Sequence, residues 1–276
     1  MATVIRPPML ISRIAYYLSS IPTLLAGLEN WWLLGLLRLG IRGRGAPILR
    51  LRRSPLRFHV RTAMDVWVIK EVCLDRDYEG GGVRLLDGWT FLDVGAGIGD
   101  FSISVAQRLP GSRVIALEPF PSSHQLLLDN IRLNRVSNVQ ALGYALGAGS
   151  GPHRLRAGQA EPGQSSTARR GRGVATHEEE VPGRSLAGLF EELEIERCDF
   201  VKMDCEGAEY EILMTADEAT LARIPHIALE YHDLYTDHSH EELAEFLGAK
   251  GYRIRTEPSP AHREIGYLFA SRRPLG

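Results

Sequence analysis

The stretch Phe91-Leu92-Asp93-Val94-Gly95-Ala96-Gly97-Ile98-Gly99-Asp100-Phe101 decides the fold of this chain. The apolar run that ends at Val94 predicts a buried strand, and the apolar spacing after Asp100 predicts a helix. Three glycines at alternate positions separate the two elements. Because glycine accepts positive φ and leaves space beside the backbone, we expect a tight strand-to-helix turn around a ligand. The free N–H groups of the following helix point toward the same place.

The acids beside this turn indicate which kind of ligand it holds. The dinucleotide fingerprint is Gly-x-Gly-x-x-Gly, whereas this turn reads Gly-x-Gly-x-Gly-Asp. Asp93 and Asp100 place carboxylates where they would repel a pyrophosphate and attract a sulfonium or an amino group. The sequence therefore favours S-adenosylmethionine (SAM) over a nicotinamide dinucleotide, and the alternative is a glycine-rich turn without a ligand.

A second strand, about 113–118, ends in Glu118, roughly 20 residues beyond the first glycine of the turn. An acid at this place accepts hydrogen bonds from the two ribose hydroxyls of an adenosine cofactor. We expect Glu118 in that role, with Phe120 beside the adenine. The alternatives are a solvated strand end for Glu118 and a place in the core for Phe120.

Composition restricts the class of protein. At 276 residues with 44 % hydrophobic content, the chain is long enough for one domain with attachments. A net charge of −2 gives no general attraction to nucleic acid. The three cysteines, Cys73, Cys198 and Cys205, lack metal-ligand spacing and suit a reducing compartment. The sequence predicts a cytoplasmic protein without a metal site formed by cysteines.

Residues 9–39 are unusually apolar but are interrupted by Arg13, Pro22, Glu29 and Asn30. The uncharged part is shorter than the ~20 residues that a spanning helix needs, and no signal-peptide cleavage site follows a basic start. We expect two amphipathic helices that meet near Pro22 or Asn30.

An arginine-rich stretch follows these helices and extends to Arg61, with no acid before Asp65. The sequence thus divides into an N-terminal segment, 1–56, and a main domain, 57–276. One interpretation is a peripheral contact of residues 9–53 with an anionic membrane surface. The others are a cap on the domain with solvated arginines, and a contact with nucleic acid.

The remaining elements complete an α/β pattern. Residues 139–142 and 199–203 read as strands, and 227–231 as another that leads to His232. The Gly-, Ser-, Pro- and Arg-rich stretch 148–183 predicts an inserted loop. Two strand-like runs, 252–256 and 265–271, are joined by so short a link that they must be antiparallel. Seven strands with a terminal hairpin differ from the six-stranded dinucleotide fold.

Residues 57–271 resemble the FkbM family of SAM-dependent methyltransferases. The resemblance rests on the glycine turn, on Val114-Ile115-Ala116-Leu117-Glu118-Pro119, on Asn130-Ile131-Arg132-Leu133-Asn134, and above all on Val201-Lys202-Met203-Asp204-Cys205-Glu206-Gly207-Ala208-Glu209. Ser185-Leu186-Ala187-Gly188 departs from the family's usual Thr-Leu-Asp-Asp.

The resemblance implies a seven-stranded, doubly wound class I methyltransferase sheet (Rossmann-like α/β), with strand order 3-2-1-4-5-7-6, strand 7 antiparallel and an N-terminal helical extension. It also implies O-methylation of a hydroxyl on a sugar, glycan or polyketide-like metabolite. The residues that we expect to hold the cofactor are Asp93, Gly95, Ala96, Gly97, Gly99, Glu118, Phe120 and Asp204.

Methyl transfer to a hydroxyl needs removal of a proton, and Asp204, Glu206 and His232 are the candidates for the base, since they follow neighbouring strands. Three alternatives stay open. His232 can be a surface histidine, and the acids can be ordinary stabilisers of a helix N-terminus. Asp204 can also hold a divalent cation together with Glu230 or His232.

Two other functions stay open. A nucleic-acid methyltransferase is disfavoured because an acidic cleft suits a phosphate backbone poorly. A non-catalytic scaffold with the SAM fold would bind partners through the N-terminal helices.

Overall fold

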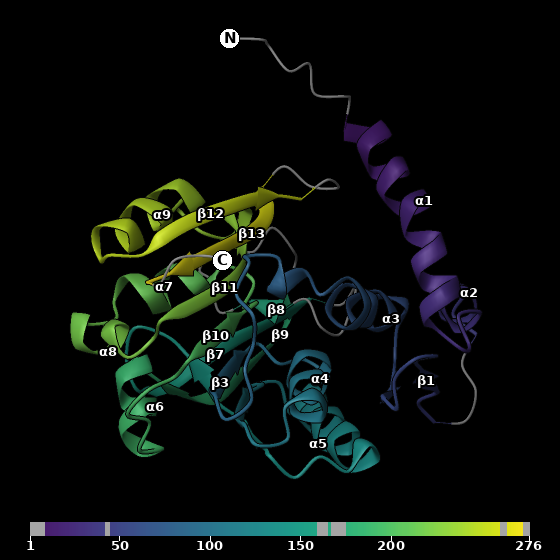
Figure 1. The fold of residues 1–276 in the computed structure, drawn as a ribbon, viewed down its shortest axis with the longest axis horizontal. Helices are drawn as coiled ribbons and strands as arrows, with labels where there is room; N and C mark the ends of the chain where they lie inside the picture. The colour runs from purple at the N-terminus through teal and green to yellow at the C-terminus, as the bar shows by residue number, and fades with distance from the viewer. Residues whose placement is uncertain (1–8, 42–44, 159–164, 167–174, 260–263, 273–276) are drawn as a thin grey trace.

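A seven-stranded sheet forms the centre of the molecule in the computed structural model, which describes residues 9–41, 45–158, 165–166, 175–259 and 264–272 (Figure 1). Its strand order is β12-β13-β11-β10-β3-β4-β5. Six of these strands run in the same direction, and β13 alone runs in the opposite direction. The predicted order and the predicted reversed strand are thus confirmed. The bounds are β3 (Thr90–Val94), β4 (Arg113–Leu117), β5 (Val139–Leu142), β10 (Phe200–Met203), β11 (His226–His232), β12 (Arg253–Pro258) and β13 (Ile265–Ser271).

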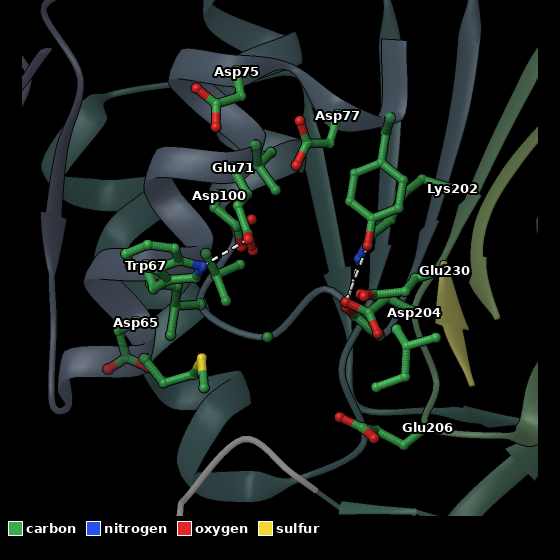
Figure 2. A pocket seen from close by; sticks show the side chains of 18 of the residues that line it. Asp65, Trp67, Glu71, Asp75, Asp77, Asp100, Lys202, Asp204, Glu206 and Glu230 are labelled. Carbon is green, nitrogen blue, oxygen red and sulfur yellow. Dashed lines mark hydrogen bonds between the residues drawn. The ribbon is translucent and has the colours of Figure 1, made fainter. Parts of the chain in front are cut away.

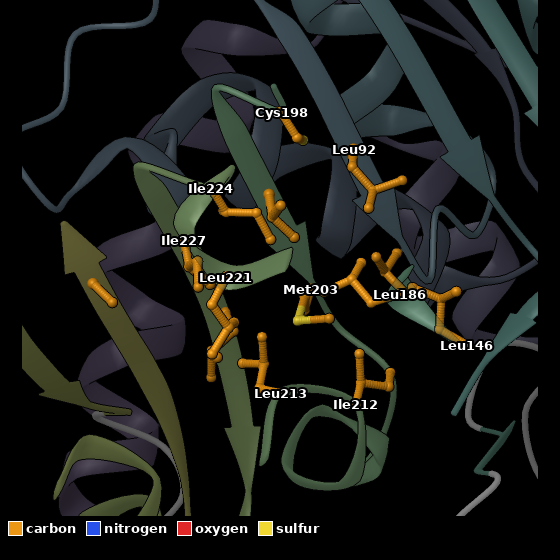
Figure 3. Close-up of a cluster of buried hydrophobic side chains, with 14 of the residues drawn as sticks. Leu92, Leu146, Leu186, Cys198, Met203, Ile212, Leu213, Leu221, Ile224 and Ile227 are labelled. Atoms are coloured by element: carbon orange, nitrogen blue, oxygen red, sulfur yellow. The ribbon is translucent and has the colours of Figure 1, made fainter. Parts of the chain in front are cut away.

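Helices cover both faces of this sheet, as a doubly wound fold requires. Successive strand residues point to opposite faces, so Leu92 packs in one cluster of buried side chains and Phe91 in another. The cluster around Leu92 includes side chains of α6 (Leu186–Glu192), α7 (Ala208–Met214) and α8 (Glu218–Ala222) (Figure 3). It also includes side chains of α9 (His240–Ala249). The opposite face packs against α4 (Asp100–Arg108) and α5 (Pro121–Asn134). Burial on both faces explains why the strands read as continuous apolar runs.

A second, four-stranded sheet replaces the loop that we predicted over 148–183. Its order is β6-β9-β7-β8, formed by β6 (Ala145–Leu146), β7 (Gly151–Gly158), β8 (Ser165–Ser166) and β9 (Ala175–Arg184). The loop prediction was wrong for the described part, because β7 and β9 pair antiparallel from Gly151↔Gly183 onward. These strands are polar and Gly-rich and are not joined by a two-residue turn, so no hairpin signal marks them. Residues 159–164 and 167–174 lie outside the described part of the chain.

The N-terminal segment forms α1 (Met9–Gly27), α2 (Leu33–Arg38) and β1 (Ile48–Arg50). The predicted break is correct at Asn30, whose side chain bonds the backbone of β1 at Ile48 O (2.8 Å) and Arg50 N (3.0 Å). It is wrong at Pro22, which lies inside α1. Because proline has no N–H, the carbonyl of Leu18 receives no helical hydrogen bond from Pro22. Both residues are exposed, so water can donate to that carbonyl. None of the described helices has the length and apolar character that crossing a membrane requires.

Backbone pairing joins the N-terminal segment to the main domain. β1 pairs antiparallel with β2 (Arg57–His59), so the strand pair crosses the predicted boundary between residues 56 and 57. Asn130 of α5 accepts a hydrogen bond from His59 N (2.7 Å) and donates to Ile98 O (2.9 Å). From β2 the chain continues through α3 (Ala63–Ile69), the π-helical segment η1 (Lys70–Asp75) and the short turn η2 (Asp77–Glu79), while η3 (Asp233–Tyr235) follows β11.

Replacing Asn130 by alanine should lower the free energy of unfolding by about 2 kcal/mol or more, because two backbone groups lose a partner. Asn130 is fully buried, so water does not replace the lost bonds. Urea denaturation of the variant against wild type measures the effect. Asp129→Ala, which removes an exposed ion pair with Arg132 and an exposed hydrogen bond from Gln125 on the same helix, is the control and should change stability by less than about 1 kcal/mol. Equal stability of the two variants would contradict the role assigned to Asn130.

Candidate active site

A cavity of about 1350 Å³ lies at the carboxyl ends of β3, β4, β10 and β11. Its inner wall comes from the loops that follow these strands and includes Gly95, Glu118, Asp204 and His232. The opposite wall comes from α1, α2, α3 and η1. The N-terminal segment therefore forms part of the cavity.

The glycine turn has the predicted left-handed backbone, with φ of +73° at Gly95, +54° at Gly97 and +90° at Gly99. A Cβ on Gly95 would lie 1.9 Å from the carbonyl oxygen of Asp204, so only glycine lets the loops after β3 and β10 touch. A Cβ on Gly97 would meet nothing within 4 Å, and Gly97 lines the cavity. The backbone of Gly97 is thus open to a ligand. Gly99 precedes α4, beside Leu127.

Asp93 lies beneath the turn and is fully buried. Ser102 Oγ donates to Asp93 Oδ2 (2.6 Å), and Lys202 Nζ lies 3.0 Å from Asp93 Oδ1. Lys202 Nζ also donates to Gly95 O (2.8 Å). Burial alone would lower the pKa of Lys202, but Asp93, Asp204 and other carboxylates outweigh burial and raise it. Asp93 therefore fixes the turn from below through Lys202, and buried Ala96 packs against Leu127.

Glu118 points its carboxylate into the cavity beside the turn. Oε2 accepts a hydrogen bond from Gly97 N (2.8 Å), and Oε1 accepts one from Phe120 N (2.9 Å). Burial raises the pKa of Glu118 to about 7. Each oxygen keeps a second lone pair, so the carboxylate can accept two further hydrogen bonds from a ligand. Phe120, whose ring was expected near an adenine, also lines the cavity.

Carboxylates face the cavity from two sides (Figure 2). Glu71, Asp75, Asp77 and Asp100 stand on one side, and Asp204, Glu206 and Glu230 stand on the other with Lys202. Burial raises the pKa of Asp77, Asp100 and Glu206 to about 7. Such an excess of acidic groups favours a ligand that carries positive charge.

Several cavity residues were not predicted from the sequence. Tyr78 donates a hydrogen bond from its hydroxyl to Asp204 Oδ2 (3.1 Å), and Trp67 donates from Nε1 to Glu71 (2.7 Å). Both come from the α3–η2 segment, which carries no recognisable motif. The sequence contains one indication that Lys202 belongs to the site, because it is a charged residue between Val201 and Met203 in an apolar strand.

The three candidates for a base meet around the side chain of His232, which is 3 % exposed. Its Nε2 atom lies 3.9 Å from Asp204 Oδ1 and 3.8 Å from Glu206 Oε2. Its Nδ1 atom lies 3.3 Å from Oε1 of the fully buried Glu209. Burial alone would lower the pKa of His232, but Glu209, Glu206 and Glu230 outweigh burial and raise it well above the usual value.

Glu209 is itself held in place. It accepts hydrogen bonds from Cys205 N (2.6 Å) and Gly207 N (2.8 Å), at the turn that leads into α7. In this turn Glu206 has a φ of +54°, which is rare for a residue with a side chain and is typical of functional sites. Glu209, Glu206 and His232 form a set in which a carboxylate orients an imidazole whose other nitrogen faces the cavity.

The same residues could also hold a cation. Asp204, Glu230 and His232 each offer a ligand atom, and these atoms lie within 4.8 Å of one another. Two carboxylates and an imidazole form a donor set that divalent metals accept. An Nε2 atom that binds a metal cannot accept a proton, so the two roles of His232 exclude one another.

We expect the ligand-free protein to lose stability as the pH rises from about 5 to about 8. Asp77, Asp100, Glu118 and Glu206 each have a folded pKa of about 7, above their unfolded values. At a pH between the unfolded and the folded pKa values, the folded chain therefore binds more protons than the unfolded chain. The stability present at low pH is lost as the pH rises through the folded pKa.

Urea denaturation across this pH range measures the slope. Glu118→Gln, which removes one titrating group, should reduce the steepness of this slope by on the order of 1 kcal/mol per pH unit. A free energy of unfolding that rises with pH over this range would contradict the assignment.

Comparison with known proteins relates this geometry to a family. A family model described as "Methyltransferase FkbM domain" matches residues 93–254, which include the glycine turn, Glu118, Asp204 and His232. The chain is 27 % identical to 31-O-demethyl-FK506 methyltransferase FkbM of Streptomyces tacrolimicus, over 83 % of this chain and 97 % of that protein. It is 26 % identical to Methyltransferase 1 of Beauveria bassiana, over 75 % of this chain and 89 % of that protein.

Two further matches cover less of their proteins. The chain is 28 % identical to AMB antimetabolite synthetase AmbE of Pseudomonas aeruginosa over 60 % of this chain, but it spans 9 % of that protein. The crystal structure of Methyltransferase FkbM from Methylobacillus flagellatus shares the fold with a TM-score of 0.50 and 18 % identity, over 75 % of this chain and 54 % of that one. The family match covers more than half of the chain, from the first glycine-turn acid to the start of β12. This chain therefore belongs to the FkbM family of methyltransferases, whose methyl donor is S-adenosylmethionine.

Proposed function

We propose that this protein transfers the methyl group of SAM to a hydroxyl oxygen of a small acceptor, a sugar, glycan or polyketide-like metabolite. The observation that carries the proposal is the imidazole of His232, held at Nδ1 by Glu209 and open at Nε2 toward the cavity. The name of the relative from Streptomyces tacrolimicus, 31-O-demethyl-FK506 methyltransferase, specifies a substrate that lacks a methyl group on oxygen.

The residues at the inner end of the cavity fit SAM. The two free lone pairs of Glu118 suit the ribose hydroxyls, the open backbone of Gly97 suits close approach of the nucleoside, and Phe120 supplies an apolar surface for the adenine. Asp100 and Asp204 line the same cavity and supply negative charge toward a cationic group. Gly95, Ala96 and Gly99 shape the turn, and Asp93 fixes it from beneath. SAM, when bound, supplies an electrophilic methyl group on its sulfonium.

His232 serves as the general base in this proposal. With Nδ1–H donated to Glu209, the lone pair of Nε2 faces the cavity and can accept the acceptor's hydroxyl proton. The carboxylates of Glu209 and Glu206 then stabilise the imidazolium, which is why they raise its pKa. Asp204, held by the hydroxyl of Tyr78, lies beside Nε2 and can orient the acceptor hydroxyl. A base of this kind contributes about 10²–10⁴-fold to a rate.

The outer wall supports an acceptor with an apolar body. Tyr17, Ile21, Leu25 and Trp31 line the cavity, and each is more than 40 % exposed. A polyketide-like acceptor would contact these side chains where they face the cavity. The acids of the inner wall disfavour a nucleic-acid backbone, which carries regular negative charge.

Methyl transfer from isotopically labelled SAM to a panel of hydroxyl compounds tests the function. The panel includes simple sugars, polyketide alcohols and 31-O-demethyl-FK506, and mass spectrometry with NMR locates the label. We expect a methyl ether on one class, and no product with Glu118→Ala, which should lose its affinity for SAM. Calorimetric binding of SAM by wild type, without transfer to any oxygen, would favour a non-catalytic scaffold or another acceptor atom.

Two variants test the pairing of His232 with Glu209. His232→Asn should lower kcat by about 10²–10⁴-fold. Glu209→Gln should lower the pKa of His232, because it removes the largest influence that raises this pKa. Since the base is active when neutral, the rate rises with pH through this pKa, and the acidic limb of the Glu209→Gln profile should move to lower pH. Full turnover by His232→Asn would show that another group takes the proton, and an unmoved limb would show that Glu209 does not set this pKa.

A further inference from the structure

Helix α1 exposes a stripe of apolar side chains along one face. Ile14, Leu18, Ile21 and Leu25 are between 42 % and 60 % exposed, and their spacing of four, three and four residues places them on one side of the helix. Leu24, on another side of the helix, is buried against the body of the molecule, as is Leu28 just after the end of the helix. The stripe is therefore additional to the face with which α1 already packs.

The exposed apolar surface continues beyond α1. Trp31 and Trp32 are 44 % and 53 % exposed, Leu39 is 75 % exposed and Ile41 is 55 % exposed. Tyr17 and Leu36 of the same segment are exposed as well, and among the described residues outside it the exposed large apolar side chains are Met64 and Leu86. We refer to the following eight N-terminal side chains together as the N-terminal apolar face: Ile14, Leu18, Ile21, Leu25, Trp31, Trp32, Leu39 and Ile41. A concentration of this kind marks an interaction surface.

Arginines border the N-terminal apolar face. Residues 1–61 contain ten arginines, no lysine and one acid, Glu29, although the whole chain has a net charge of −2. Arg52 donates from Nε to the carbonyl of Leu25 (3.2 Å), so a guanidinium lies against the exposed stripe. Arg13 and Arg38 line the cavity beside Ile21 and Trp31. The positive charge of this segment thus lies next to its apolar surface.

Two occupants could cover an apolar face of this size, a second copy of the chain or a lipid bilayer. In a two-fold dimer the same surface meets itself, so the arginines of one copy would face those of the other. An anionic bilayer instead offers headgroups to the arginines and an apolar layer to the leucines, and tryptophan prefers the boundary between these layers. Charge complementarity therefore favours the bilayer.

We propose that the N-terminal apolar face docks on an anionic lipid bilayer. Ile21, Leu25 and Trp31 belong both to this face and to the cavity wall, so docking brings the cavity to the lipid surface. In Figure 1, α1 stands at the edge of the molecule, away from α6, α8 and α9, so the body would project from the membrane. This inference does not depend on which atom the enzyme methylates.

Flotation of the full-length protein with vesicles tests the proposal. We expect wild type to float with vesicles of phosphatidylcholine and phosphatidylglycerol, to stay behind with phosphatidylcholine alone, and to be released by high salt. The double variant Leu18→Asp/Leu39→Asp should bind about tenfold less, as should Arg38→Glu. Leu86→Asp and Arg253→Glu place the same changes at exposed positions outside the N-terminal segment and should float like wild type.

Circular dichroism and calorimetric SAM binding establish that each variant is folded. Flotation of wild type with neutral and anionic vesicles alike, or with neither, would overturn the proposal. So would flotation of the Leu18→Asp/Leu39→Asp variant at the wild-type level. Sedimentation in which wild type dimerises and Leu18→Asp does not, without binding of wild type to vesicles, would assign the face to a second copy of the chain.

Discussion

The buried ammonium group of Lys202 joins the two central strands at the point where they form the site. Lys202 on β10 lies opposite Asp93 on β3 in the parallel register, and its Nζ also bonds the carbonyl of Gly95. Asp93, Asp100 and Asp204 surround this cation. Without a positive charge at this place, three carboxylates would face one another in a region with little water, which costs far more free energy than a surface repulsion. The glycine turn therefore depends on a side chain from another strand.

The sheet could be predicted from sequence, because burial on both faces leaves apolar runs that need no tertiary information. The location of the inner wall of the cavity could be predicted as well, since its residues stand where strands end. Gly95, Glu118 and Asp204 lie on this wall, whereas Asp93 lies beneath the turn, and their role in holding the cofactor stays a prediction. The outer half could not be predicted. Trp67, Glu71 and Tyr78 reach the cavity from α3, the π-helical η1 and the short turn η2, whose geometry no short pattern specifies.

The second sheet shows another limit of local patterns. β7 and β9 satisfy each other's backbone groups, and this pairing does not require apolar side chains. Composition does not distinguish polar, glycine-rich strands from a loop when the strands pair with residues far away in the sequence. The sequence named Glu209 only as part of the motif that resembles the family. Its contact with His232 depends on the pairing of β10 with β11, and α7 and α8 separate these strands along the chain.

The contact between Gly95 and Asp204 has a consequence for redesign of this enzyme. A side chain at position 95 is excluded twice, by the left-handed backbone and by the carbonyl that would lie 1.9 Å from its Cβ. Relieving one obstacle would leave the other, so no single compensating change elsewhere could make another residue acceptable there. Attempts to alter the preference for a methyl donor would have to begin at side chains such as Glu118 or Phe120, which can be exchanged without moving the two loops apart. Position 95 is thus a fixed point around which the rest of the cavity can be varied.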